Sequence, residues 1–245
     1  MSPRYALIGD GRLATSLGPY LHQSGAALTL WSRRAEASGG LALRDVVSEA
    51  DIVLLAISDG AIEGFAAEHR AILKGKRLVH FSGAHSFEGM TGWHPLFSFP
   101  AHAVPLNQMS TILFVGEEMD EDGNTDFGDI FPMLSNPCTA ITKEQKPLYH
   151  ALAVLSGNLV SFTWNEVARV AEEELGLPPV PLLVPYFRSL IDGFTASPLD
   201  SLTGPVARGD QATVEKNLAA LESQPALRPL YDALLTAAAR KGIPS

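Results

Sequence analysis

The chain has 245 residues, of which 46% are hydrophobic and 18% are charged, so it can bury a substantial core in one or two domains. Its net charge of −9 and its lack of a clustered basic segment argue against nucleic acid or an anionic membrane surface as the main partner. The single cysteine, Cys138, excludes an intrachain disulfide, and no Cys or His cluster has the spacing of a structural zinc site.

The first predicted elements are a strand that begins at Tyr5, a tight turn and a helix. The turn reads Gly9-Asp-Gly-Arg-Leu-Ala14. Gly9 would allow the turn, Gly11 would let the backbone approach a pyrophosphate, and Ala14 would let the helix pack closely on the strand. Amides at the start of the helix would hold the anion. The predicted dinucleotide-binding residues of this turn are Gly9, Asp10, Gly11, Arg12 and Leu13.

This first helix, Leu13 to Ser24, is expected to stop at Gly25, and the second strand is expected over Ala27 to Trp31. This strand is followed by Ser32-Arg33-Arg34, where an NAD-preferring fold carries an acidic residue. A hydroxyl and guanidinium groups would bind a 2′-phosphate that a carboxylate would repel. The position therefore favours NADP, the alternative being a solvated basic turn.

Two further strands follow, at Asp51 to Ile57 and at Arg77 to Phe81, separated by a helix over Ala61 to Arg70. Asp59 is placed to cap that helix. Ligands of open α/β sheets lie beyond the carboxyl ends of the strands. The residues that follow these two strands are therefore expected to border the cofactor cleft, and they are Ser58, Asp59, Ser82 and Gly83.

The pattern predicts another strand at Ser110 to Val115 and an acidic surface loop at Asp120 to Asp129. Helical periodicity dominates from Lys143 onward, which places a domain boundary near Asn136-Pro137. We therefore predict an α/β fold with a Rossmann-like, mostly parallel sheet and helices on both faces, followed by an all-helical domain. The predicted domains are a dinucleotide-binding domain, 1–137, and a helical substrate and dimerisation domain, 138–245.

A long helix is predicted from Tyr149 to about Leu175, ended by Gly176. At 100° per residue, Gly157 and Ser161 lie close to His150 on one side, and that side has no Lys or Glu between His150 and Asn165. The stripe is expected to face a cleft, the alternative being a solvent-exposed face. Further helices are predicted at 182–193, 211–221 and 227–239, with a loop at Leu202 to Asp210 between them.

Several segments together resemble a bacterial family that has a Rossmann-like domain followed by a helical domain of unknown function. These segments are Gly9-Asp-Gly-Arg-Leu-Ala14, His94-Pro-Leu-Phe-Ser-Phe99, Tyr149-His150, Asn158 and Thr203-Gly-Pro-Val-Ala-Arg-Gly-Asp210. The family looks like a relative of pyrroline-carboxylate reductase and ketopantoate reductase. The resemblance implies NADP bound on the first domain, reduction of a C=O or C=N bond of a small carboxylate in an interdomain cleft, and a homodimer formed through the helical domain.

The proton donor does not follow directly from that resemblance. Ketopantoate reductases have a lysine followed four residues later by asparagine, whereas here Lys146 is followed by His150. We predict that His150 donates the proton, with His94 as the next candidate, the alternative being that either is a structural histidine. Asn158 is expected to orient a more distant part of the substrate or cofactor, and Arg208 to bind the substrate's carboxylate.

Two other classes of function remain open at this point. A non-catalytic NADP-binding sensor or assembly protein could use the same fold. A methyltransferase is the weaker alternative, because Ser32 and Arg33 would bind the hydroxyls of an adenosyl ribose poorly. The sequence enters a strand within five residues and carries no long apolar segment, so a cytoplasmic protein is expected.

Overall fold

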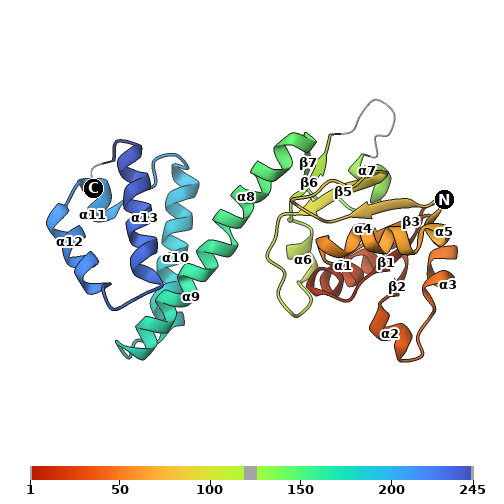
Figure 1. The fold of residues 1–245 in the computed structure, drawn as a ribbon, viewed down its shortest axis with the longest axis horizontal. Helices are drawn as coiled ribbons and strands as arrows, with labels where there is room; N and C mark the ends of the chain where they lie inside the picture. The colour runs from red at the N-terminus through yellow and green to blue at the C-terminus, as the bar shows by residue number, and fades with distance from the viewer. Residues whose placement is uncertain (1, 119–125, 244–245) are drawn as a thin grey trace. The chain divides into compact units, whose positions relative to one another are not determined.

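The computed structural model describes residues 2–118 and 126–243, and the chain divides into two compact units, Met1–Gly157 and Asn158–Ser245. The first unit contains a seven-stranded sheet with the order β2-β1-β3-β4-β5-β6-β7 (Figure 1). Its strands are β1 (Arg4–Ile8), β2 (Ala27–Trp31), β3 (Ile52–Leu55), β4 (Arg77–His80), β5 (Met90–Pro95), β6 (Phe114–Glu117) and β7 (Cys138–Ile141).

All neighbouring strands pair in parallel except β5 and β6, which are antiparallel. The predicted Rossmann-like, mostly parallel sheet is therefore confirmed. From β1 the chain first adds β2 on one side and then β3 on the other, so the strand order reverses between β1 and β3. Ligands of such sheets bind at the carboxyl ends of the strands beside this reversal.

Helices cover both faces of the sheet because its central strands are apolar on both sides. Tyr5 and Leu7 of β1 pack in one core with residues of α1, and Ala6 and Ile8 pack in a second core with residues of α3 and α4. The helices of this unit are α1 (Arg12–Gln23), α2 (Arg33–Ala37), α3 (Leu43–Ser48), α4 (Asp59–Glu68), α5 (Arg70–Leu73), α6 (Leu106–Met109), α7 (Phe127–Ile130), the 3₁₀ turn η1 (Lys143–Gln145) and α8 (Lys146–Ser156).

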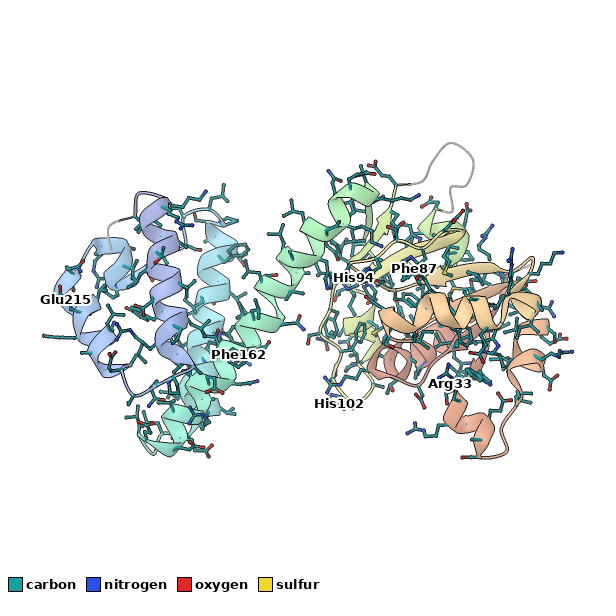
Figure 2. All side chains as sticks on the ribbon, viewed as in Figure 1. Arg33, Phe87, His94, His102, Phe162 and Glu215 are labelled. Atoms are coloured by element: carbon teal, nitrogen blue, oxygen red, sulfur yellow. The ribbon has the colours of Figure 1, made fainter. Side chains whose placement is uncertain are left out.

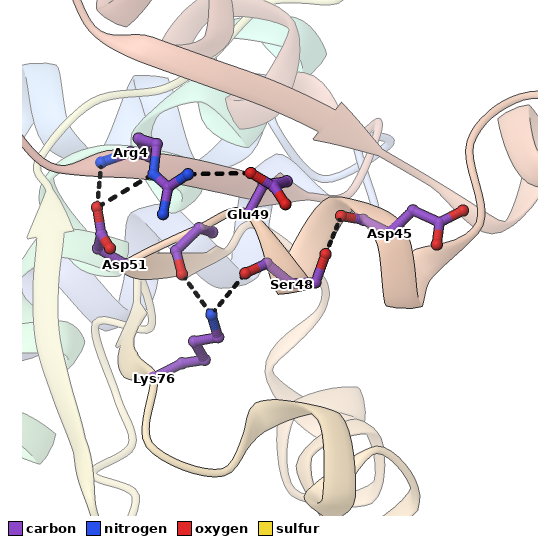
Figure 3. Close-up of polar contacts among 7 residues, drawn as sticks. Arg4, Asp45, Ser48, Glu49, Asp51 and Lys76 are labelled. Atoms are coloured by element: carbon purple, nitrogen blue, oxygen red, sulfur yellow. Dashed lines mark hydrogen bonds and ion pairs between the residues drawn. The ribbon is translucent and has the colours of Figure 1, made fainter.

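A group of polar contacts holds together the amino-terminal ends of the parallel strands around β1 (Figure 3). Arg4 forms ion pairs with Glu49 and Asp51, and the Lys76 ammonium donates to the carbonyls of Ser48 and Ala50. These contacts join the starts of β1, β3 and β4. The glycine turn lies at the opposite, carboxyl-terminal ends of the same strands.

The structure departs from the sequence expectations at three places in this unit. Strands β5 and β7 were not expected, because neither has the long apolar run of β3. The strand expected at Ser110 to Val115 begins later, at Phe114. The surface loop expected at Asp120 to Asp129 lies partly outside the described residues, and its last part contributes to α7, whose Phe127 and Ile130 are buried.

The second unit is built, in its described residues, from α9 (Asn158–Glu173), α10 (Pro179–Ala196), α11 (Gly204–Arg208), α12 (Gln211–Ala220) and α13 (Leu227–Arg240). The single long helix expected from Tyr149 is wrong, because α8 ends at Ser156 and Gly157 separates it from α9. The angular count of the polar stripe assumed one continuous helix and does not extend across Gly157. No helix within the described ranges is long and apolar enough to span a membrane.

The boundary between the two compact units, after Gly157, lies later in the chain than the domain boundary expected near Asn136-Pro137. Asn136 is buried, accepts a hydrogen bond from Tyr20 and donates to the carbonyls of Met109 and Ile112. Strand β7 and helix α8 are therefore part of the first compact unit. The functional boundary at 137 stays a prediction, since compactness alone does not say which residues serve which function.

Candidate active site

The predicted cofactor turn lies at the strand reversal, where β1 ends. Gly9 has a φ of +127°, and its amide donates to the carbonyl of Trp31, which ties the turn between β1 and α1 to the end of β2. Gly11 is the N-cap of α1 and places no side chain on the helix amides, and a Cβ added at Gly11 would meet nothing within 4 Å. The turn and the end of β3 line a pocket of about 460 Å³, formed by Gly9, Asp10, Gly11, Arg12, Leu13, Ala56, Ile57, Ser58, Asp59 and Phe81.

The predicted 2′-phosphate residues follow β2. Ser32 is buried, and its hydroxyl caps α2 by accepting a hydrogen bond from the amide of Ala35. The Arg34 guanidinium is exposed and forms an ion pair with Asp10 of the glycine turn. Figure 2 shows Arg33 in the part of the first unit that contains α2. Two of the three residues thus have partners within the chain, which the sequence pattern did not indicate.

Asp59 connects the glycine pocket to the end of β4. Its expected role as the cap of α4 is wrong: Ser58 is the N-cap, no side chain caps the helix, and Asp59 is the first helical residue. The Asp59 carboxylate instead accepts a hydrogen bond of 2.6 Å from the Ser82 hydroxyl. Because Asp59 also lines the glycine pocket, Ser82 and the adjacent Gly83 are joined to that pocket through a single side chain.

Gly83 lies against the two histidines that the sequence analysis selected. A Cβ at this position would stand 2.6 Å from His150 Nδ1 and 3.0 Å from the ring of His94, so only glycine leaves room for both rings. His94 comes from β5 (Figure 2) and His150 from α8, and their ring centroids are 5.9 Å apart in an edge-to-face arrangement. The fold therefore brings together two residues that are far apart in the sequence.

Tyr149 completes this group of rings, which we call the His94–Tyr149–His150 cluster. Its hydroxyl and His94 Nδ1 are 2.7 Å apart and share a hydrogen bond. Burial, together with the charges of His150 and Lys146, lowers the pKa of His94 to about 4, so this imidazole is neutral near pH 7. Burial raises the pKa of Tyr149 to about 12, so the phenol keeps its proton. His150 Nδ1 is buried and has no hydrogen-bond partner among the described residues.

A second polar group consists of His80, Glu117 and Lys146 and is buried more deeply than this cluster. The Lys146 ammonium is bonded to the Glu117 carboxylate and also donates to the carbonyl of His85, at 2.6 Å. The Ser82 amide donates to His80 Nδ1, so the neutral imidazole carries its proton on Nε2, which lies 3.5 Å from Glu117. We call these three residues the buried triad.

The triad's ionisation follows from its burial and its internal charges. Burial alone would raise the pKa of Glu117, but His80 and the Lys146 ammonium lower it to about 2. Burial lowers the pKa of His80, and the charge of Lys146 adds to that shift. Burial also lowers the pKa of Lys146, although Glu117 and Asp59 oppose this shift. Glu117 is therefore a carboxylate at neutral pH, and His80 is uncharged.

The remaining predicted residues, Asn158 and Arg208, belong to the second compact unit. Arg208 is exposed in the last turn of α11, which ends at Gly209 with a φ of +66°. Asp210 caps α12 by accepting hydrogen bonds from the amide and hydroxyl of Thr213. Much of the segment Thr203 to Asp210 is thus explained by helix ends, and the roles assigned to Asn158 and Arg208 stay predictions.

Sequence reasoning missed the buried triad and the Asp59–Ser82 hydrogen bond. His80 gave a usable signal, because a histidine inside an apolar parallel strand needs a polar partner. Glu117 lay beyond the end of the expected strand and gave none. Lys146 was noted only because the residue four positions later is histidine rather than asparagine.

Comparison with protein families gives a match over residues 112–238 to "Domain of unknown function (DUF2520)". No curated protein matches the sequence. Among solved structures, protein TM1727 from Thermotoga maritima is 27% identical, with a TM-score of 0.74 and coverage of 96% of this chain and 98% of that one. A Bacteroides fragilis protein, provisionally described as NADP oxidoreductase BF3122, is 23% identical with the same TM-score, covering 96% and 97% of the two chains.

More distant structures of the same fold contain the predicted cofactor. An imine reductase from Myxococcus stipitatus, solved with NADP⁺, is 18% identical to this chain, with a TM-score of 0.65 and coverage of 99% of this chain and 96% of that one. At this identity the likeness establishes the fold alone. The fold is therefore one that structures of NADP-dependent oxidoreductases share.

Proposed function

We propose that this chain, which belongs to the DUF2520 family, is an NADP-dependent oxidoreductase that reduces a C=O or C=N bond of a small carboxylate substrate. The proposal is carried by one observation. The glycine pocket at the strand reversal is joined, through Asp59 and Ser82, to a cluster of two histidines and a tyrosine. A reductase requires a cofactor pocket beside side chains that can donate a proton.

The residues around the glycine turn fit a dinucleotide. The open space at Gly11 and the uncapped amides of α1 suit a pyrophosphate, which the helix N-terminus would hold. Ser58, Asp59, Ser82 and Gly83 would border the cofactor, and Ser32, Arg33 and Arg34 would bind the 2′-phosphate. Arg34 would then leave Asp10 for the phosphate.

When bound, NADPH supplies the hydride, so the protein has to supply a proton to the oxygen or nitrogen of the substrate. We assign this proton to His150, which lies against Gly83, with His94 as the second candidate. A neutral His94 bonded to Tyr149 would hold the neighbouring rings in place rather than donate as an imidazolium. Asn158 would orient the substrate or cofactor, and Arg208 would bind the carboxylate with its planar guanidinium.

The proposal is tested by following NADPH oxidation against a panel of 2-oxo acids and cyclic imines. Steady turnover with any member would support a reductase. His150→Ala should then lower kcat about 10²- to 10⁴-fold while NADPH affinity changes little, because a general acid acts in the chemical step. Asn158→Ala should act mainly through the KM of the substrate.

Two outcomes would contradict parts of this proposal. Tight NADPH binding without turnover on the whole panel would favour the alternative of a non-catalytic NADP-binding sensor or assembly protein. Full kcat in the His150→Ala variant would remove His150 as the donor, and the same measurement on His94→Ala would then test the second candidate.

A further inference from the structure

Burying the charged side chains of the triad costs the first unit folding free energy. Lys146 is 4% exposed, Glu117 is 7% exposed and His80 is fully buried. Burying two opposite charges generally costs more than an apolar pair of the same size, because both lose their hydration. The ammonium of Lys146 is also committed to Glu117 and to the carbonyl of His85. It is therefore not free to act on a substrate.

Lys146 ties the start of α8 to the sheet. Lys146 is the first residue of α8, and its partners lie at the end of β6 and in the segment after β4. Tyr149 and His150 follow within the first two turns of the same helix. A bond that fixes the start of α8 to the sheet therefore also fixes how these two rings meet His94 and Gly83.

We propose that Lys146 is a positioning residue, which acts through Glu117 and the His85 carbonyl to hold the first turns of α8 so that Tyr149 and His150 lie against His94. The neighbouring residues of α8 are weaker candidates for holding its first turns in place. Pro147 stiffens its first turn but has no polar side-chain atom that could tie the helix to the sheet, and Leu148 is exposed. The importance of this position for catalysis rests on the proposed function, but the position itself does not.

The first experiment needs no substrate. Ring contacts among His94, Tyr149 and His150 are measured as nuclear Overhauser effects in the full chain, with selectively labelled histidine and tyrosine. In Lys146→Met, the His94–Tyr149 and His94–His150 effects should weaken strongly or vanish. NADPH affinity should stay within about twofold, because the glycine pocket does not contain Lys146. Lys74→Met removes the same charge at an exposed position of the same unit, and it should change neither the ring contacts nor the NADPH affinity.

Lys146→Met alone leaves the Glu117 carboxylate buried without its partner, which destabilises the fold, so a second variant is compared with it. Lys146→Met/Glu117→Leu removes both charges and should fold, because no buried carboxylate is left unpaired. If the ring contacts keep their parental intensity in this folded double variant, the positioning role is overturned. Loss of the contacts in the double variant supports it.

The pH titration of His94 separates position from charge. Its surroundings are His150, Tyr149 and Lys146 from α8, Asp59 from α4, and Gly83 and Ser82 from the segment after β4. Loss of the Lys146 charge alone would raise the pKa of His94 while the ring contacts persist. Loss of position would raise the pKa and abolish the contacts together.

Turnover gives an independent reading once a substrate is found. Both Lys146 variants should lower kcat about tenfold to a hundredfold and leave the KM for NADPH nearly unchanged, because a small misplacement affects the reacting groups and not the cofactor pocket. If the parental chain shows no turnover on any substrate, the proposed function fails, while the ring contacts still decide the role of Lys146.

Discussion

His94 illustrates how burial decides the chemistry of a single side chain. Its pKa in the folded chain is about 4, against an ordinary value of 6.5, mainly because the ring has lost water. Between pH 4 and pH 6.5, His94 is protonated in the unfolded chain but not in the folded chain. Unfolding is therefore linked to proton uptake, and the contribution of His94 lowers stability as the pH falls through this range.

We expect the free energy of unfolding to rise between pH 4 and pH 6.5, with His94 as one source of the slope. Denaturant unfolding at a series of pH values measures it. His94→Gln should flatten the curve, because glutamine does not titrate. The buried His80, whose pKa is also lowered, should keep part of the slope in this variant. An unchanged slope in His94→Gln would contradict the burial of a neutral His94.

The residues after β2 give the second prediction at this scale. If Arg33 contributes to a 2′-phosphate site, the chain should bind NADPH more tightly than NADH, and Arg33→Ala should narrow the gap by about 1–3 kcal/mol, as expected for a charge-assisted hydrogen bond. Titration calorimetry with both cofactors measures the difference. Arg240→Ala, in the second unit, is the matched control. Equal affinities in the parental chain would rule the assignment out.

At the scale of elements, β1, the glycine turn and α1 form a unit in which two glycines have different tasks. Gly9 needs its backbone conformation, since its φ is +127° and a Cβ would collide with the carbonyl of Ala56. Gly11 has an ordinary extended conformation, with a φ of −73°, and open space around it. The first glycine therefore serves the fold, and the second leaves room for a ligand.

This difference predicts that alanine at Gly9 affects stability, whereas alanine at Gly11 affects cofactor binding. Gly9→Ala should lower the free energy of unfolding by at least about 2 kcal/mol, since it combines backbone strain with a collision. Gly11→Ala should change stability by less than about 1 kcal/mol but weaken NADPH binding about tenfold or more, because the methyl group would occupy the phosphate space. Thermal unfolding and cofactor titration on both variants check this. Normal NADPH binding by a folded Gly11→Ala would place the pyrophosphate elsewhere.

Helix α8 is the other element whose local sequence has a clear structural reading. Pro147 near its start suits a first helical turn, where no amide hydrogen bond is lost. Gly157 follows its last residue and separates it from α9. These two residues limit α8 to the stretch that carries Lys146, Tyr149 and His150.

At the scale of the whole molecule, the second unit exposes an unusual number of large apolar side chains. They include Leu159 and Phe162 of α9, Tyr186, Ile191 and Phe194 of α10, and Leu234 of α13, each at least 47% exposed. Phe162 is labelled in Figure 2. Apolar surface on this scale is typical of an interface between subunits.

We therefore expect a homodimer formed through the helical unit. Light scattering on a size-exclusion column at micromolar concentration should give about twice the chain mass of 26.2 kDa. Replacing Ile191 and Phe194 by aspartate should shift the mass to that of the monomer, because a closed symmetric interface would bury both charges twice. Replacing the exposed Glu215 by glutamine is the control. A monomer at these concentrations would contradict the prediction.

Sequence alone was sufficient for the features that local physics dictates. The glycine turn, the apolar strands β1 to β4 and the helices α1 and α4 follow from side-chain periodicity and from the backbone needs of Gly9, and the Rossmann-like fold follows from the alternation of strands and helices. Strands β5 and β7 were not predicted, because their residues lack a continuous apolar run and only pairing with β4 and β6 makes them strands.

The candidate site was only partly accessible from the sequence, because its contacts join distant residues. His94 and His150 were selected by type and resemblance, but their meeting at Gly83 depends on β5 and α8 packing at one sheet edge. Glu117 and Lys146 become partners only when the fold brings the end of β6 to the start of α8. Periodicity describes what a residue does within its own element, whereas burial, pKa and hydrogen-bond partners depend on which elements the tertiary fold brings together.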